Sequence, residues 1–270
     1  MQIAKFLKKG LTIPLCVLCL FALNSCVPTK DMIYLQSDDP GPQQADFFNN
    51  KEEYRLQKHD VLDIKIYSLN PEINAIFNAS ATATTQTAQA TAQTGGDLYY
   101  ISGYTIDNDG EIDIPFVGEV AVLGLTLNEA YAAINAKVAT MFNNFHLNVK
   151  LGGVRFSALG EFHRPGKHVV MQNQVTILEA LALCGDLTAV ANRSRLKVIR
   201  QYPGGSRTYE VNLLGEEFIE SPLYFLQPND VLYAEPLPQK SWGFGVTGAQ
   251  TFNTFSTFSA IILSVLSLTR

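Results

Sequence analysis

Residues 54–62 read Tyr-Arg-Leu-Gln-Lys-His-Asp-Val-Leu, and residues 224–232 read Tyr-Phe-Leu-Gln-Pro-Asn-Asp-Val-Leu. Six of the nine positions carry the same residue (Tyr, Leu, Gln, Asp, Val and Leu). In each stretch an Asp stands before an apolar run, which predicts a turn that leads into a buried strand. The separation is too long for a solenoid repeat, so we expect two small mixed α+β domains, at 53–152 and 153–236.

Each expected domain contains one helix. The pattern Thr-x-x-Glu at 126–129 and again at 176–179 predicts capping boxes, in which the Thr and Glu side chains satisfy free backbone N–H groups at the helix start. Apolar spacing extends the first helix to about Met141, and the second is expected to stop at Gly185. The Asn-Asp-Gly of residues 108–110 predicts the turn of a hairpin.

Two polar segments flank or interrupt the first domain. Residues 26–52 are polar and contain Pro, as expected for a tether ahead of the first domain. Residues 73–96 carry no charge and are dominated by Ala, Thr, Gln and Asn. This composition provides little apolar surface to bury, so we expect a low-complexity loop inserted between strands.

The start of the chain predicts export and lipid anchoring. Residues 1–25 combine basic residues with an apolar run of the length of a signal peptide. The sequence Leu-Asn-Ser-Cys ending at Cys26 resembles the bacterial lipoprotein processing box, which implies that Cys26 is acylated and becomes the first mature residue. Position 27 is Val rather than the Asp associated with inner-membrane retention, so we expect an outer-membrane lipoprotein with its domains in the periplasm. The alternative is an ordinary secretory signal with an incidental Cys.

Cysteine usage leaves no disulfide within the mature chain. Cys16 and Cys19 lie in the expected signal and Cys26 would be acylated, which leaves only Cys184. Cys184 follows an apolar helical run, so we interpret it as a small buried residue rather than a nucleophile.

The last thirty residues, 241–270, contain no charge before the terminal Arg270. A helix over 247–268 would span about 33 Å, roughly one bilayer core, so we expect a C-terminal amphipathic transmembrane helix. An amphipathic core or interface helix is the alternative. On a helical wheel one stripe is small and mostly polar, and several copies could turn it inward around water. The expected pore-lining residues are Asn253, Ser256, Thr257, Ser264 and Ser267. The expected lipid-facing residues are Phe252, Phe255, Phe258, Ile262, Val265 and Leu266.

Charge and motifs exclude several functions. Without the three lysines of the signal the chain has 17 basic and 25 acidic residues, a net charge of −8, which argues against nucleic-acid binding. No metal-ligand spacing joins the four His residues, although His163 and His168 flank the turn at 165–166. The acids near 107–113 do not fit an EF-hand loop. We find no catalytic motif, no metal site and no cofactor signature, and expect no enzyme activity.

Taken in order, several segments resemble the polysaccharide export lipoproteins of the Wza type. Residues 54–64 resemble the opening of the polysaccharide export domain, and residues 104–120, with Ile-Asp-Ile-Pro-Phe-Val-Gly at 112–118, resemble its core. Residues 160–166 resemble the entry of a soluble-ligand-binding β-grasp (SLBB) domain, whose helix and closing strand match 176–185 and 226–232. The chain departs from the family in its insert and in having room for one β-grasp repeat.

The resemblance implies an outer-membrane channel that exports capsular or extracellular polysaccharide. It further implies a homo-oligomeric, eight-fold ring with a pore of C-terminal helices, palmitate on the lipidated Cys, and an inner-membrane polysaccharide co-polymerase as partner. A neutral, hydroxyl-lined pore would suit a hydrated polymer, because weak hydrogen bonds permit sliding. The alternatives are a monomeric periplasmic lipoprotein that binds glycan or peptidoglycan through its β-grasp domain, and a surface adhesin.

Overall fold

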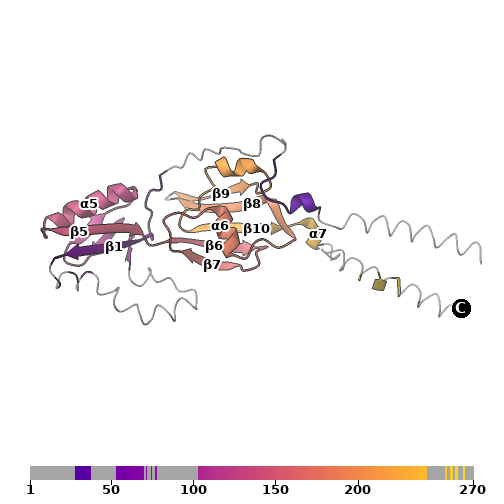
Figure 1. The fold of residues 1–270 in the computed structure, drawn as a ribbon, viewed down its shortest axis with the longest axis horizontal. Helices are drawn as coiled ribbons and strands as arrows, with labels where there is room; N and C mark the ends of the chain where they lie inside the picture. Colours follow the sequence, from indigo (N-terminus) through magenta and orange to yellow (C-terminus); the bar gives the residue numbers. More distant parts are fainter. Residues whose placement is uncertain are drawn as a thin grey trace, which may run out of the picture.

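The computed structural model describes residues 28–37, 53–69, 71, 74, 77, 103–202 and 204–241, and residues 253, 256, 257, 259, 260 and 264 of the tail. These residues form two α+β units that lie end to end (Figure 1). Each unit has its own hydrophobic core, and Leu151, at the end of the first unit, contacts both cores.

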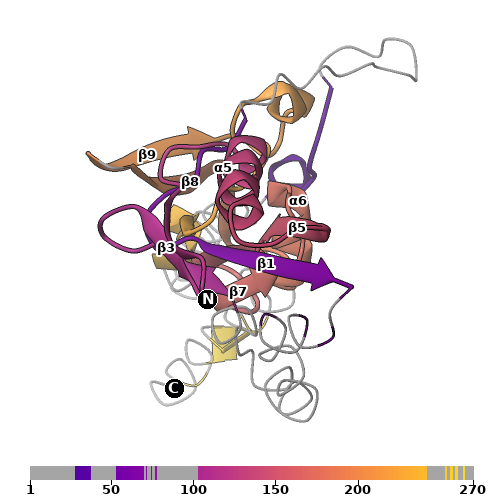
Figure 2. The ribbon, with the colours of Figure 1, turned by 90° about the vertical axis from the view of Figure 1, so that its left-hand side faces the viewer.

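The first unit pairs a three-stranded sheet with one helix. Strands β1 (Val61–Ser68), β2 (Tyr104–Thr105) and β5 (Phe145–Leu151) form an antiparallel sheet in the order β2-β1-β5. Alternate residues of β1 are buried, as expected for a strand with one face on a core. Helix α5 (Leu127–Ala139) adds Ala130, Ile134 and Val138 to that core. Figure 2 shows α5 together with β1 and β5 at the near end of the molecule.

The hairpin of the first unit lies later in the chain than the sequence predicts. Strand β3 (Glu111–Ile114) pairs with β4 (Gly118–Ala121), around a turn in which Phe116 and Gly118 have positive φ angles of 67° and 83°. Residues 107–111 do form a turn, with Asp107 Oδ1 accepting the N–H groups of Asp109 and Glu111 at 2.9 Å each. The strand before this turn, β2, pairs with β1 instead, so the predicted hairpin about 108–110 is wrong.

The second unit has a five-stranded mixed sheet in the order β7-β6-β10-β8-β9. Its strands are β6 (Val154–Gly160), β7 (Gly166–Val170), β8 (Ala191–Tyr202), β9 (Gly205–Val211) and β10 (Asp230–Pro236). The hairpins β6–β7 and β8–β9 flank the sheet, and β10 inserts between them, parallel to β6 and antiparallel to β8. Helix α6 (Ile177–Leu183), short helices η1 (Thr29–Asp31) and η2 (Glu216–Glu220), and α7 (Pro238–Ser241) complete the described elements.

The core of the second unit forms between α6 and one face of the sheet. Ile177, Ala180 and Leu181 of the helix are buried in the same cluster as Phe156 of β6 and Leu196 of β8. Cys184, at the end of α6, is completely buried, and burial raises the pKa of its thiol to about 11. This agrees with the interpretation of Cys184 as an unreactive core residue.

The insert contributes to the first core at one described position. Phe77 is buried, and its ring lies edge-on to the rings of Phe116 and Phe142, with centroids 6.2 and 5.5 Å away. The side-chain amide of Asn74 donates to the backbone oxygen of Ser68 and accepts from its N–H. At these positions the segment packs on the domain, whereas the rest of 73–96 lies outside the described residues.

The expected C-terminal transmembrane helix is wrong. Among the residues that the structure describes, none of the helices is both long and apolar enough to cross a bilayer. Helix α5 has 13 residues and carries Glu129 and Lys137, and α7 has only 4 residues. Of the tail, the structure describes only residues 253, 256, 257, 259, 260 and 264.

Candidate functional site

The two copies of the repeated stretch form the same turn. In the first, the N–H of Gln57 donates to Asp60 Oδ2 at 2.8 Å, and in the second the N–H of Gln227 donates to Asp230 Oδ2 at 2.8 Å. The residue before each Asp has a left-handed backbone, with φ of 68° at His59 and 66° at Asn229. Both Asp side chains are buried, so each holds its turn together from the inside.

Each turn packs against the capped start of a helix from a distant part of the sequence. Residue 55 bridges to Thr126 before α5, and residue 225 bridges to Thr176 before α6. Both capping boxes are present, with the Thr side chain accepting from the Glu N–H and the Glu side chain accepting from the Thr N–H. The predicted capping boxes are therefore confirmed. The sequence repeat marks a structural module of turn, strand and capped helix that occurs once in each unit.

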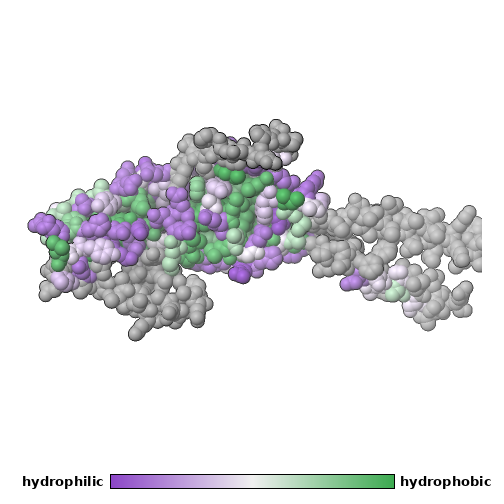
Figure 3. All heavy atoms as spheres, viewed as in Figure 1, coloured by the Kyte–Doolittle hydropathy of each residue, from purple (hydrophilic) through white to green (hydrophobic). Residues whose placement is uncertain are grey.

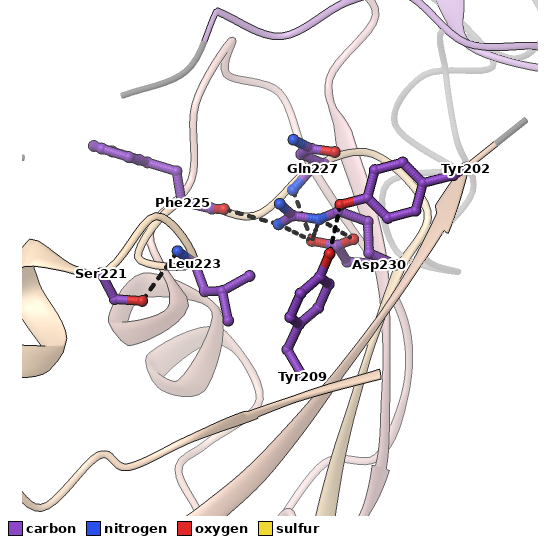
Figure 4. A network of polar contacts seen from close by, with 8 residues as sticks. Tyr202, Tyr209, Ser221, Leu223, Phe225, Gln227 and Asp230 are labelled. Carbon is purple, nitrogen blue, oxygen red and sulfur yellow. Dashed lines mark hydrogen bonds and ion pairs between the residues drawn. The ribbon is translucent and has the colours of Figure 1, made fainter. Parts of the chain in front are cut away.

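A buried ion pair completes the second module. Arg200 of β8 donates from Nε to Asp230 Oδ1 at 3.0 Å and from Nη2 to Oδ2 at 2.8 Å, and its Nη2 also donates to the backbone oxygen of Phe225 at 3.1 Å. Both side chains are almost fully buried. Figure 4 shows Asp230 with Gln227 and Phe225 beside it. The hydroxyls of Tyr202 and Tyr209, which are hydrogen-bonded to each other, lie close to this ion pair.

In the first module a tyrosine donates to the buried Asp, and the charge of Arg155 on β6 also acts on it. The hydroxyl of Tyr54 donates to Asp60 Oδ2 at 2.5 Å, so Oδ2 receives two hydrogen bonds. Oδ1 of Asp60 is buried, and no donor within the described part of the chain reaches it. Burial raises the pKa of the Asp60 carboxyl, although Tyr54, the Gln57 N–H and the charge of Arg155 oppose the shift. Ionisation of Asp60 is thus less favourable here than in water.

The two modules meet where the units join. Asp60 lies within electrostatic reach of Arg155 on β6, and the Tyr54 phenol lies within reach of Asp230 and Arg200. The chain crosses from β5 to β6 through Gly152 and Gly153 alone, and the N–H of Gly152 donates to the Val61 backbone oxygen at 2.7 Å. A side chain at Gly153 would place its Cβ 2.7 Å from a backbone oxygen. The junction is therefore a buried, charged joint with a very short connection.

Residues 28–37, which the sequence assigns to a tether, lie against the second unit. The hydroxyl of Tyr34 donates to Asp186 Oδ1 at 2.5 Å, and the guanidinium of Arg193 stacks over the Tyr34 ring, 5.3 Å from its centroid. The N–H of Leu35 donates to Leu213, and Gln36 forms a parallel bridge with Gly215. We call residues 28–37 the strap. It contacts the end of the second unit that is remote from the first.

The same end holds the last described helix. The N–H of Leu237 donates to the Val190 backbone oxygen at 2.7 Å, and Lys240 pairs with Glu161. Thr188, beside the strap's contacts, also donates to Glu161. Figure 1 shows η1, the indigo coil of the strap, near α7 at the right-hand end. The strap and the exit of the domain toward the tail therefore share one end of the molecule.

The structure describes some of the residues that the sequence predicts to be functional, but not all of them. Cys26, Ser267 and all six expected lipid-facing residues lie outside the described residues. The remaining expected pore-lining residues, Asn253, Ser256, Thr257 and Ser264, are helical and exposed, and the Thr257 hydroxyl donates to the Asn253 backbone oxygen at 2.6 Å. Their role around a pore stays a prediction.

The described part of the chain contains no cluster of His, Cys, Asp and Glu that could hold a metal ion. The ring nitrogens of the two turn histidines contact backbone oxygens instead: Nδ1 of His163 that of Asp186 at 3.1 Å, and Nε2 of His168 that of Arg164 at 3.0 Å. The arrangement provides a short connection between the units, with charged groups beside it, and a docked strap. Sequence reasoning missed Arg200 and the strap, because both act through contacts distant in the chain.

Comparison with known proteins gives consistent results. Residues 49–152 match the family model described as polysaccharide biosynthesis/export protein. The chain is 25% identical over 187 residues to the EPS I polysaccharide export outer membrane protein EpsA of Ralstonia nicotianae, covering 67% of this chain and 47% of the relative. It is 26% identical over 188 residues to the EpsA of Ralstonia solanacearum, covering 68% of this chain and 48% of the relative.

The chain thus spans about half the length of the curated relatives it matches. The family model covers the whole first module. The similarity to the Ralstonia nicotianae relative extends over 187 residues, which is longer than the first unit. The Wza type and the SLBB assignment remain predictions. The resemblance to polysaccharide export proteins is confirmed by the match of residues 49–152 to the polysaccharide biosynthesis/export family model.

Proposed function

We propose that the chain is an outer-membrane lipoprotein that exports capsular or extracellular polysaccharide. The family match of residues 49–152 is the observation that carries this proposal. The names of the two relatives, polysaccharide export outer membrane proteins, support both the cargo and the location. The family acts in transport, which supports a role without catalysis.

The proposal includes a ring of identical copies, eight-fold by the family resemblance, with an inner-membrane co-polymerase as partner. Two features of each copy are compatible with this assembly. The buried pair Arg200–Asp230 stabilises the second unit, and the two-residue connection at 152–153 keeps the two units close together. The exposed polar residues of the tail, among them Ser256 and Thr257, would face the polymer in that ring.

The second unit fits the proposed β-grasp-like assignment. The hairpins β6–β7 and β8–β9 flank the central strand β10, which is parallel to β6, and α6 lies between the two hairpins in the chain. Residues of the sheet's outer face, such as those of β10, are partly exposed. Figure 3 shows hydrophobic residues among hydrophilic ones on the surface of the second unit. This surface leaves area for contacts between copies.

The native mass of the full chain in mild detergent separates the ring from the monomeric binding lipoprotein. We expect an assembly of many copies for the full chain. A monomer under all mild extraction conditions would contradict the ring and leave an anchored glycan-binding module. The export role itself is tested by the location of the polymer in cells depleted of the chain.

A further inference from the structure

The strap presents a short apolar surface to its surroundings. Met32 and Ile33 follow η1 and are 38% and 50% exposed, and Lys30 in the same turn is exposed as well. The second unit holds this turn in place, because Tyr34 donates a hydrogen bond to Asp186 and Leu35 packs on the second core. Two apolar side chains are thus displayed on a fixed base instead of on a mobile terminus.

The position of this turn in the chain places it next to the expected lipid anchor. Cys26 precedes Pro28 by two residues. This inference rests on the acylation of Cys26 and on the proposed function. Successive Cα atoms are 3.8 Å apart, so the Cα of Pro28 lies within about 8 Å of that of Cys26. Acyl chains on Cys26 enter the bilayer, so the start of the docked strap must lie at the membrane surface.

Exposure alone would not select this surface. Leu69 and Phe116, in the first unit, are 90% and 68% exposed. They belong to the end of the molecule remote from the strap, because Leu69 follows the end of β1 while the start of β1 joins the second unit. Only the apolar residues of the strap are close in the chain to the site of acylation.

We propose that Met32 and Ile33 enter the lipid interface of the membrane that holds Cys26. The second unit then stands on the bilayer through its strap end, and the first unit points away from it. Apolar side chains that reach the headgroup region add binding energy to a lipid anchor, and exposed Lys30 suits anionic headgroups. The strap thereby gives the second unit a fixed orientation on the membrane, which a ring at a membrane requires.

Site-specific fluorescent labels test the proposal on the full lipidated chain in vesicles of phosphatidylethanolamine and phosphatidylglycerol. Buried Cys184 is protected from the label, so the variants Ile33→Cys, Met171→Cys and Leu69→Cys each offer one reactive thiol. Met171, 52% exposed, lies near the junction and serves as an intermediate control. A quencher attached to lipid acyl chains should quench the label at Ile33 severalfold more than the label at Leu69.

Equal, weak lipid quenching at Ile33 and Leu69 would overturn the proposal, provided that mass spectrometry shows acyl chains on Cys26. A Met32→Cys variant repeats the measurement at the neighbouring position, and weak quenching at both positions would count against the strap as a whole. Polysaccharide export by the unlabelled variants is measured separately. Normal export with a water-exposed strap would leave the proposed function intact and refute only the membrane contact.

Discussion

The two modules allow a matched test, because the same substitution in the same turn should affect stability strongly in one module and little in the other. In Asp230→Asn, the buried Arg200 guanidinium loses its counter-charge. Removing one partner of a buried ion pair destabilises by about 3–5 kcal/mol. We therefore expect the free energy of unfolding of the second unit to fall by about that amount.

In Asp60→Asn, the result should differ. Both hydrogen bonds to Asp60 end on Oδ2, from Tyr54 and Gln57, and an Asn carbonyl oxygen at that position accepts both. The amide then occupies the place of Oδ1, which no described donor reaches. Because a neutral group replaces a carboxylate whose burial is unfavourable, we expect stability within about 1 kcal/mol of the unsubstituted protein, on the more stable side at neutral pH.

The pH dependence gives the same test a second arm. Burial raises the pKa of Asp60 above its ordinary value of 3.8. The folded state therefore holds its proton to higher pH than the unfolded state, and the stability of the first unit falls as pH rises from 3.8 through the folded pKa. This decline should be absent in Asp60→Asn, which lacks the titrating carboxyl.

Hydrogen exchange of the detergent-solubilised full chain, read by mass spectrometry, measures the two units separately. The amide of Leu56 reports on the first module and that of Leu226 on the second, since they bond to Leu125 and Val175 across each module. Equal loss of protection in both variants, or a larger loss in Asp60→Asn, would refute the assignment of the two carboxylates.

Three further substitutions test local features of the fold. Thr126→Ala removes a helix cap and should lower the unfolding free energy by about 1 kcal/mol in urea titrations, and an unchanged midpoint would count against the cap. Gly160→Ala should destabilise the protein far more than Gly118→Ala in the same titrations. Both glycines have a positive φ, but of the two only Gly160 would place a new Cβ against a backbone oxygen, at 2.1 Å. Similar losses of stability in the two variants would contradict this. Tyr34→Phe removes the bond to Asp186, so the strap amides should exchange faster, and unchanged exchange would show that this bond does not hold the strap.

The sequence predicts the parts of the fold that depend on local chemistry. The capping boxes at 126–129 and 176–179 and the repeated Asp turns are encoded within a few residues, so they can be recognised without a structure. The contact between each Asp turn and its helix cap could not be predicted from the sequence. Residue 55 pairs with Thr126, and residue 225 with Thr176, only in the folded chain.

The remaining errors arise from long-range contacts. The turn at 107–111 has the residues of a hairpin, yet β2 finds a better partner in β1, and the hairpin forms one strand later. Arg200 is one of several basic residues of β8, so the strand alone does not single it out, and its counter-ion lies thirty residues away. The transmembrane prediction is wrong for the residues that the structure describes, whose helices are too short or carry charges, such as Glu129 and Lys137 of α5.

The location of the polymer in living cells tests the central claim most directly. A producing strain is depleted of the chain, and polysaccharide is measured outside the cells and in the periplasm, with the unsubstituted chain and Cys26→Ser supplied back. Export by this protein predicts loss of extracellular polymer, accumulation inside, and rescue by the unsubstituted chain but not by Cys26→Ser. Undiminished extracellular polymer in the depleted cells would contradict it.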